Sequence, residues 1–192
     1  MIDLNEIDIV HISGSCSLEN HPKIEFTNGV RLGIMMYGFS SIPKLSTGLK
    51  NKLRAIKANL RIKKLNISKT YNSSNLKLRP CTNLYSSVVQ VKKVKKSEFV
   101  GYGANYIAED DIFVATVPIG YADGINKRQT GNTVVIKNKD YPIIGTISMG
   151  MISIKVDQTI EVGDLVKLID QDNVKKWSSY IGTNVYDLMT NI

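Results

Sequence analysis

The sequence has few of the features that mark membrane, secreted or metal-dependent proteins. Among its 192 residues are two cysteines, Cys16 and Cys81, which form neither a disulfide framework nor the CxxC pair of many metal sites. No apolar run approaches the ~18 residues that a membrane-spanning helix needs. The segment MIDLNEIDIV lacks the basic and apolar regions of a secretory signal. We therefore expect a cytoplasmic protein without a metal site.

The composition is that of an ordinary globular protein, with an excess of positive charge. Twenty-five Lys and Arg residues against 17 Asp and Glu residues give a net charge of +8. Much of the excess lies in residues 50–64 and in the segment 92–96. Such charge is typical of nucleic-acid or membrane binding, but these runs lack the interleaved aromatic residues of a nucleic-acid site. We interpret them as solvated faces and expect no nucleic-acid or membrane partner.

The first part of the sequence has the rhythm of an α/β unit. Apolar runs at Ile7–Ile12 and Val30–Tyr37 predict strands, and the small polar residues 11–17 predict a loop after the first of them. Apolar residues spaced three and four apart predict an amphipathic helix over Leu49–Leu65, and Asn66–Asn75 is typical of a linker. Because a complete (β/α)8 barrel takes ~250 residues, this region supplies only the last part of one.

The second part of the sequence has the pattern of a small all-β domain. Short Val- and Ile-rich runs alternate with Gly, Asn and Asp from Leu76 onward. Asn138 suits a hairpin turn, because Asn tolerates a positive φ, and residues 161–164 predict another tight turn. One or two helices are expected after Asp170. We therefore predict a mainly β domain, a small barrel or sandwich, over residues 76–192, preceded by the last strands and helices of a barrel over residues 1–75.

Five short motifs carry a more specific signal. The β domain contains GYGANYIA, VPIGYADG and GTISMGM, and the earlier part contains HISGSCS and VRLGIMMYG. Taken in the order of the chain, they resemble the motifs of the alanine racemase family, which run roughly as HxANSA, VRxGIxxYG, SYGATYTA, IPIGYADG and GRxSMDQ. The resemblance covers nearly the whole chain and is poorest between Leu45 and Asn75.

The resemblance implies a fold, a reaction and a cofactor. Alanine racemases consist of an N-terminal (β/α)8 barrel and a C-terminal β-domain, and they work as homodimers whose active sites take residues from both subunits. They interconvert L- and D-alanine for peptidoglycan by two-base proton exchange on substrate held by pyridoxal 5'-phosphate (PLP). The family's lysine motif, of the type VxKANAYGHG, does not occur in these residues. We expect the chain alone to be inactive, as a truncated piece or one half of a split enzyme.

The motif matches imply a set of cofactor-binding residues. Ser15 matches the family's phosphate-binding serine, and Gly33 and Ile34 match the two residues whose backbone N–H groups bind the same phosphate. Arg31 matches the arginine that donates a hydrogen bond to the pyridine nitrogen, and it does so as a permanent cation. Tyr186 falls on a C-terminal tyrosine whose hydroxyl also reaches the phosphate.

The same matches imply the residues that contact substrate. Tyr102 corresponds to the tyrosine that reaches in from the partner subunit and exchanges the α-proton on one face, so it is the predicted catalytic residue. Met149 corresponds to a residue whose backbone N–H binds the substrate carboxylate. Tyr121 and Tyr106 are predicted to line a narrow entrance. Gly150 replaces a family aspartate near that entrance.

Two alternatives remain open at the level of sequence. One is a related racemase acting on serine or another amino acid. Such serine racemases tend to carry asparagine at the C-terminal tyrosine position, so Tyr186 favours alanine. The other is a non-catalytic interaction module that keeps the racemase motifs as a scaffold and binds an acidic partner through Leu49–Leu65; the missing lysine motif favours this reading.

Overall fold

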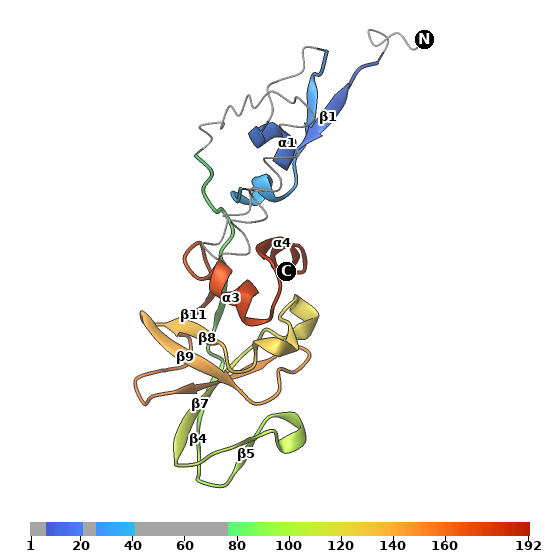
Figure 1. Ribbon diagram of the computed structural model, residues 1–192. Helices are drawn as coiled ribbons and strands as arrows, with labels where there is room; N and C mark the ends of the chain where they lie inside the picture. Colours follow the sequence, from blue (N-terminus) through green and yellow to red (C-terminus); the bar gives the residue numbers. More distant parts are fainter. Residues whose placement is uncertain (1–6, 21–25, 41–76) are drawn as a thin grey trace, which may run out of the picture. The chain divides into compact units, whose positions relative to one another are not determined.

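The computed structural model describes residues 7–20, 26–40 and 77–192 (Figure 1). The chain divides into two compact units, unit 1 (Met1–Pro80) and unit 2 (Cys81–Ile192). Three predictions lie outside the described residues: the helix at Leu49–Leu65, the linker at Asn66–Asn75 and the boundary between residues 75 and 76.

Unit 1 contains a parallel strand–helix–strand arrangement, as an α/β unit requires. β1 (His11–Gly14) leads directly into α1 (Ser15–Asn20), and β2 (Gly29–Arg31) pairs with β1 in parallel. The 3-10 helix η2 (Ile34–Tyr37) follows β2 and buries the side chains of Ile34 and Met35.

The predicted element bounds in unit 1 are wrong. The first strand begins at His11 rather than Ile7, and residues 11–17 form this strand and the start of α1 instead of a loop. The second apolar run is strand only as far as Arg31, because the chain turns at Gly33 into η2. A short apolar run does not distinguish a strand from a short helix by its period alone, so the pattern misplaced these boundaries.

Unit 2 is built on a curled antiparallel sheet, which confirms the predicted mainly β fold. The strand order is β3-β11-β8-β9-β10-β7-β4, and every neighbouring pair runs antiparallel. The strands are β3 (Leu84–Ser87), β4 (Gln90–Val94), β7 (Ile112–Val117), β8 (Thr133–Ile136), β9 (Lys139–Ile144), β10 (Ile152–Val156) and β11 (Leu165–Ile169).

The two edges of this sheet are joined by only two residues. β3 and β4 lie at opposite ends of the strand order, yet Val88 and Val89 alone separate them in the chain. The Val88 N–H donates to the carbonyl of Asp164, beside β11, at 2.9 Å, and the Val89 N–H donates to the carbonyl of Thr116, in β7, at 2.9 Å. The sheet therefore curls until its two edges meet at this link.

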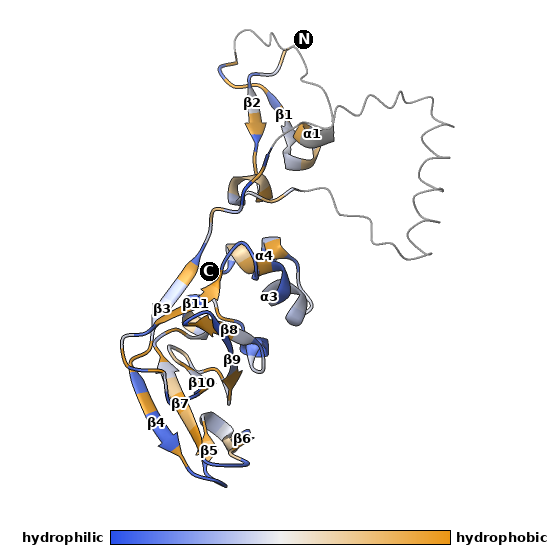
Figure 2. Ribbon diagram, turned by 90° about the vertical axis from the view of Figure 1, so that its left-hand side faces the viewer, coloured by the Kyte–Doolittle hydropathy of each residue, from blue (hydrophilic) through white to orange (hydrophobic). Residues whose placement is uncertain are grey.

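The core of unit 2 lies inside the curled sheet. Inward-facing residues of successive strands are fully buried, among them Ile136, Ile143, Ile154 and Leu168 at 0% exposure. β7 is largely apolar, whereas β4, at an edge of the strand order, is largely hydrophilic (Figure 2). Lys92 and Lys93 lie on β4, where charged side chains hinder pairing with the strand of another molecule.

Three smaller pieces complete unit 2. The hairpin of β5 (Phe99–Val100) and β6 (Tyr106–Ile107) carries the 3-10 helix η3 (Tyr102–Ala104), and the chain ends with α3 (Val174–Tyr180) and α4 (Val185–Thr190). These helices confirm the expectation after Asp170. In both views the helices lie at the opposite end of unit 2 from the β5–β6 hairpin (Figures 1 and 2). No helix within the described residues has the length and hydropathy to cross a membrane.

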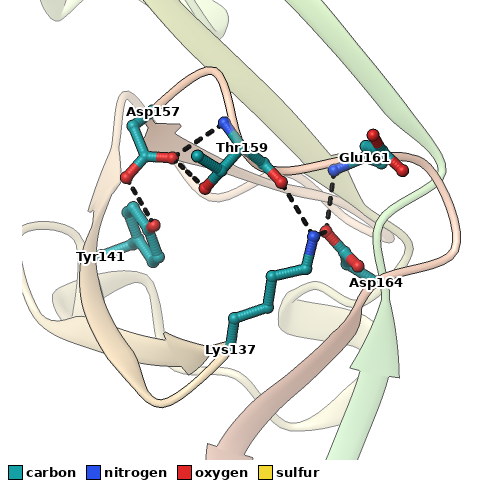
Figure 3. A network of polar contacts seen from close by, with 6 residues as sticks. All are labelled: Lys137, Tyr141, Asp157, Thr159, Glu161 and Asp164. Carbon is teal, nitrogen blue, oxygen red and sulfur yellow. Dashed lines mark hydrogen bonds and ion pairs between the residues drawn. The ribbon is translucent and has the colours of Figure 1, made fainter.

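A two-residue turn joins β8 to β9, as the sequence predicts for Asn138. Both Lys137 (φ 49°) and Asn138 (φ 62°) adopt left-handed backbone, which matches the twist of a tight hairpin. The Lys137 Nζ binds the Asp164 carboxylate at 2.8 Å and donates to the Thr159 carbonyl at 2.8 Å (Figure 3). The hairpin is therefore tied to the predicted turn at 161–164, which lies between β10 and β11.

Asp157 is the centre of a second group of polar contacts at this end of the sheet (Figure 3). Its carboxylate accepts hydrogen bonds from Lys139 Nζ at 2.7 Å, Tyr141 Oη at 2.8 Å and the Thr159 N–H at 3.0 Å. The Lys139 hydrogen bond, followed by those from Thr159 and Tyr141, holds the pKa of Asp157 well below its usual range.

Loss of core packing at Ile154 is expected to destabilise unit 2 strongly. Ile154 lies in β10, between β7 and β9, and is 0% exposed. Ile154→Ala should lower the free energy of unfolding by about 2–5 kcal/mol, through lost burial and the cavity left behind. Urea denaturation measures the change. Val162→Ala, at a side chain that is 65% exposed, serves as control and should stay within about 0.5 kcal/mol of the parent.

The Asp157 contacts predict a specific pH dependence. A carboxyl group whose pKa is lowered on folding stabilises the fold above its unfolded pKa of about 3.9, and the contribution is lost as the pH falls through the folded pKa. Asp157→Asn should therefore lower stability at neutral pH and make the decline below about pH 4 shallower. Denaturant titrations at several pH values test this.

The matched control is Asp110→Asn. The Asp110 side chain is exposed and makes no hydrogen bond or ion pair with another described residue. Its curve should follow that of the parent chain. An Asp157→Asn curve that runs parallel to the parent over the whole acid range would contradict the assigned role of the carboxylate.

Candidate functional site

The ends of the two parallel strands of unit 1 bring hydrogen-bond donors together. Ser15 follows β1 directly, and Gly33 follows β2 after one intervening residue. The Gly33 N–H donates to the Ser15 Oγ at 2.9 Å, and this contact is partly buried. Ile34 comes next in the chain, at the start of η2. Ligands of parallel α/β units bind at the carboxyl ends of the strands, which is where these three residues lie.

Arg31 adds a permanent positive charge to the same pair of strands. It is the last residue of β2, is exposed, and donates from Nη2 to the Ile12 carbonyl at 3.1 Å. A guanidinium has five N–H donors, so this single contact leaves others for a ligand. The family resemblance implies that the partner of Arg31 is the pyridine nitrogen of PLP.

The donor set of unit 1 fits the phosphate group of PLP. A phosphate dianion is bound by hydroxyl and backbone N–H donors. The Gly33 N–H donates to the Ser15 Oγ at 2.9 Å, which leaves the hydroxyl hydrogen of Ser15 for an acceptor, and the N–H would bind a phosphate oxygen in place of the Oγ. Among the described residues there is no group of three or more His, Cys, Asp or Glu side chains suited to a metal ion. Hydroxyl and backbone N–H groups, as at Ser15 and Gly33, are the kinds of group that bind an organic phosphate.

Tyr102 lies at the tip of the β5–β6 hairpin in unit 2. It begins η3 and is flanked by Gly101 (φ 79°) and Gly103 (φ 73°), both in left-handed backbone that glycine adopts without strain. Its side chain is 75% exposed. The phenol is therefore directed away from the interior of the β-domain, as a residue that reaches a neighbouring molecule requires.

Thr146 contacts the Tyr102 turn, and sequence reasoning did not single it out. Its Oγ1 donates to the Tyr102 carbonyl at 2.9 Å and accepts from Asn105 Nδ2 at 2.9 Å. Thr146 belongs to the GTISMGM motif, but the motif carries no sign that its second residue reaches the GYGANYIA motif. Only the folded backbone reveals this contact.

Tyr121 and Met149 are brought together by backbone hydrogen bonds. The Tyr121 N–H donates to the Ser148 carbonyl at 3.0 Å, and the next N–H, from Ala122, donates to the Met149 carbonyl at 2.9 Å. Tyr121 begins η4 (Tyr121–Asp123), and Lys127 Nζ lies 4.3 Å from the centre of its ring. The VPIGYADG and GTISMGM motifs therefore form one local surface.

Tyr106 occupies a more interior position than the other tyrosines predicted to contact substrate. It lies on β6, is half-buried, and packs against a core cluster of unit 2. The cluster consists of Val94, Val100, Ala108, Ile112, Val114 and Ile144. Tyr106 also lines a groove of about 360 Å³ together with Asn105, Lys127 and Thr146.

Tyr186 lies on the surface of α4, the last helix of unit 2. Its side chain is 48% exposed. The helix is capped by Asn184, whose Oδ1 accepts from the Asp187 N–H at 2.9 Å. Because α4 and the β5–β6 hairpin lie at opposite ends of unit 2 (Figures 1 and 2), Tyr186 and Tyr102 of one chain do not converge.

The predicted site residues thus fall into three groups. The cofactor residues of unit 1 converge at the ends of β1 and β2, and the GYGANYIA, VPIGYADG and GTISMGM motifs are in mutual contact in unit 2. Tyr186 lies on α4, which lines a pocket together with Tyr121 of the VPIGYADG motif.

The chain is similar to known proteins in both sequence and fold. Residues 81–192 match the model of the family described as "Alanine racemase, C-terminal domain". The chain is 32% identical over 184 residues to the alanine racemase of Listeria innocua. The aligned region covers 93% of this chain and 43% of that protein. The crystal structure of alanine racemase from Bacillus anthracis with bound L-Ala-P matches with a TM-score of 0.70 and 28% identity, over 98% of this chain and 45% of that one.

A second solved structure gives the same result. The alanine racemase of Clostridium difficile matches with a TM-score of 0.71 and 28% identity, over 98% of this chain and 44% of that one. Fold and motifs thus define the class: the chain corresponds to the C-terminal part of the alanine racemases that it matches. The chain belongs to the alanine racemase family. It spans less than half the length of these relatives.

Proposed function

We propose that this chain is the C-terminal part of a cytoplasmic PLP-dependent enzyme that interconverts L- and D-alanine and so supplies D-alanine for peptidoglycan. The observation that carries the proposal is the pairing of two features: a hydroxyl–amide donor pair at Ser15 and Gly33, and an exposed Tyr102 on a glycine-bounded turn. Both features lie in motifs of this chain that resemble those of the alanine racemase family.

Residues of unit 1, with Tyr186 of unit 2, would hold the cofactor. The Ser15 hydroxyl and the N–H groups of Gly33 and Ile34 bind its phosphate, the Tyr186 hydroxyl adds a further donor, and Arg31 donates to the ring nitrogen. When bound, PLP draws electron density from the substrate α-carbon and makes its proton acidic. In this proposal residues 1–75 are the end of a PLP-binding barrel and residues 76–192 are the β-domain.

Tyr102 would give and take the proton on one face of the α-carbon through its phenol oxygen. Racemisation also needs a proton-transfer group on the opposite face, and the lysine motif that supplies it in the family does not occur in these residues. We therefore propose that the chain by itself does not racemise alanine. Met149 would bind the substrate carboxylate through its N–H, while Tyr121 and Tyr106 would narrow the entrance.

The positions of Tyr186 and Tyr102 support an active site shared between two subunits. These tyrosines lie on elements at opposite ends of unit 2, whereas PLP and alanine are small molecules. In this proposal the two phenols reach one cofactor from different copies of the chain. A homodimer with two composite sites satisfies this requirement.

A chimera tests the proposal directly. The segment of the Listeria innocua relative that precedes its match to this chain is joined to residues 1–192, so that the protein tested contains the part of that relative outside the match. With PLP in D₂O, the chimera should replace the α-proton of L-alanine by deuterium and form D-alanine, as measured by NMR and chiral chromatography. Neither part alone should do so. Racemisation by the 192-residue chain alone would falsify the requirement for a second base outside it.

Removal of the Tyr102 hydroxyl should act on one enantiomer more than on the other. In the chimera, Tyr102→Phe should slow proton abstraction from one enantiomer by roughly 10²–10⁴-fold, the usual effect of a lost acid–base group, and from the other far less. Tyr85→Phe, on an exposed tyrosine of β3, is the matched control and should leave both rates unchanged. Equal slowing of both directions argues against a role on one face.

Ser15→Ala should weaken PLP binding. A hydrogen bond to a charged group contributes about 1.5–3 kcal/mol, so the dissociation constant of the chimera for PLP should rise roughly 10–100-fold. Titration followed by the absorbance of the bound cofactor measures it. Ser17→Ala, two residues further along α1, should bind PLP like the parent. An unchanged affinity in Ser15→Ala removes this residue from the cofactor site.

A further inference from the structure

The turn that carries Tyr102 has little support of its own. β5 and β6 are two residues long each and pair through Phe99 with Ile107 and Val100 with Tyr106. Two backbone hydrogen bonds at Ala108, with Glu98 at 3.0 Å and Ser97 at 2.7 Å, close the base of the hairpin. Their two-stranded sheet is separate from the seven-stranded sheet of unit 2. A hairpin this short is not stable by itself in water, so contacts from outside must hold the turn between its strands.

The backbone of that turn is also unusual. Gly101, Gly103 and Ala104 have positive φ angles of 79°, 73° and 49°. A non-glycine residue such as Ala104 adopts this conformation only where its surroundings impose it. The Tyr102 carbonyl, in the middle of this stretch, accepts the hydrogen bond from Thr146.

Close backbone approach brings Thr146 within reach of the turn. A Cβ on Gly145 would lie 2.6 Å from the Val100 carbonyl oxygen, and a Cβ on Gly101 would lie 3.0 Å from the Thr146 N–H nitrogen. The two segments are therefore in direct contact, and both positions exclude larger residues. Thr130 Oγ1 donates to the Gly145 carbonyl at 3.1 Å and so fixes the other side of the segment.

We propose that Thr146 is a positioning residue: its hydroxyl joins the Tyr102 carbonyl to the Asn105 side chain and thereby fixes the direction in which the Tyr102 phenol projects. The inference rests on the proposed function of Tyr102. With a side chain that is 75% exposed, Tyr102 takes its direction from the backbone that carries it. Asn105 and Tyr102 bracket the turn, and Thr146 binds both.

The first test measures the turn itself, without cofactor or activity. Thr146→Val removes the hydroxyl and keeps the size of the side chain, and Thr146→Ser keeps the hydroxyl. Water can replace the hydroxyl as partner of the exposed Asn105 amide, so both variants should fold. In the 192-residue chain, amide hydrogen exchange measured by NMR at Gly103–Asn105 should be about 5- to 10-fold faster in Thr146→Val. This is the increase in local opening expected when one hydrogen bond is lost.

The control for this measurement is Thr133→Val. Thr133 lies on β8, and its Oγ1 accepts a hydrogen bond from Lys176 Nζ at 2.9 Å, so the substitution removes a comparable contact elsewhere in unit 2. It should leave exchange at Gly103–Asn105 unchanged, and Thr146→Ser should restore near-parent exchange. An unchanged exchange rate in Thr146→Val overturns the proposal, whatever the kcat and KM of the chimera are.

The second test links the turn to proton transfer in the chimera. Thr146→Val should lower kcat by roughly 10-fold or more, as expected for a displaced catalytic group, with little change in KM. In a Tyr102→Phe background the same substitution should have no further effect on kcat, because Thr146 acts through Tyr102. Additive effects, or an unchanged kcat, overturn the proposal. An inactive parent chimera instead removes the proposed function, while the exchange measurement still decides whether Thr146 holds the turn.

Discussion

The two-residue link at Val88–Val89 is the constraint on which unit 2 depends. Because it joins the first and last positions of the strand order, the sheet cannot lie open, and its curl follows from connectivity before any side chain is considered. The curl encloses the core and brings residues from separate strands into one cluster, with Val94 from β4 and Ile144 from β9 packed against Val100 of the hairpin. The contact between the two glycine-containing loops, at Gly101 and Gly145, follows from that packing.

Backbone N–H and carbonyl groups determine much of the geometry around the predicted site residues. The Gly33 N–H holds the Ser15 hydroxyl in place. The carbonyls of Ser148 and Met149 bind the backbone of the turn that carries Tyr121. Backbone positions are set by the fold rather than by the identity of neighbouring side chains. This arrangement explains how the motif loops keep their shape in a chain that departs from the family pattern, for example at Gly150, which has no heavy atom within contact distance of an added Cβ.

The sequence predicted unit 2 better than unit 1, for physical reasons. Alternating Val and Ile with turn residues between them specify strands, and Asn138 specifies a left-handed hairpin turn. In unit 1 the run VRLGIMMY is apolar apart from Arg31 and Gly33, and nothing in its period shows that the strand ends at Arg31 and the 3-10 helix η2 begins at Ile34. The hydroxyl of Thr146 and the carbonyl of Tyr102 are 44 residues apart. A contact at that separation depends on the curl of the whole sheet, which no local pattern encodes.

The strand order has a consequence for biosynthesis. β3, the first strand of the sheet, pairs with β11, the last, so the sheet cannot be completed until the ribosome has made residue 169. During translation the nascent domain therefore exposes unpaired strand edges, and long-range pairing of this kind forms slowly. The lysines of β4 lie on one such edge. On a polysome, these lysines of one nascent chain would repel those of the next. The repulsion would protect the unfinished domain from aggregation.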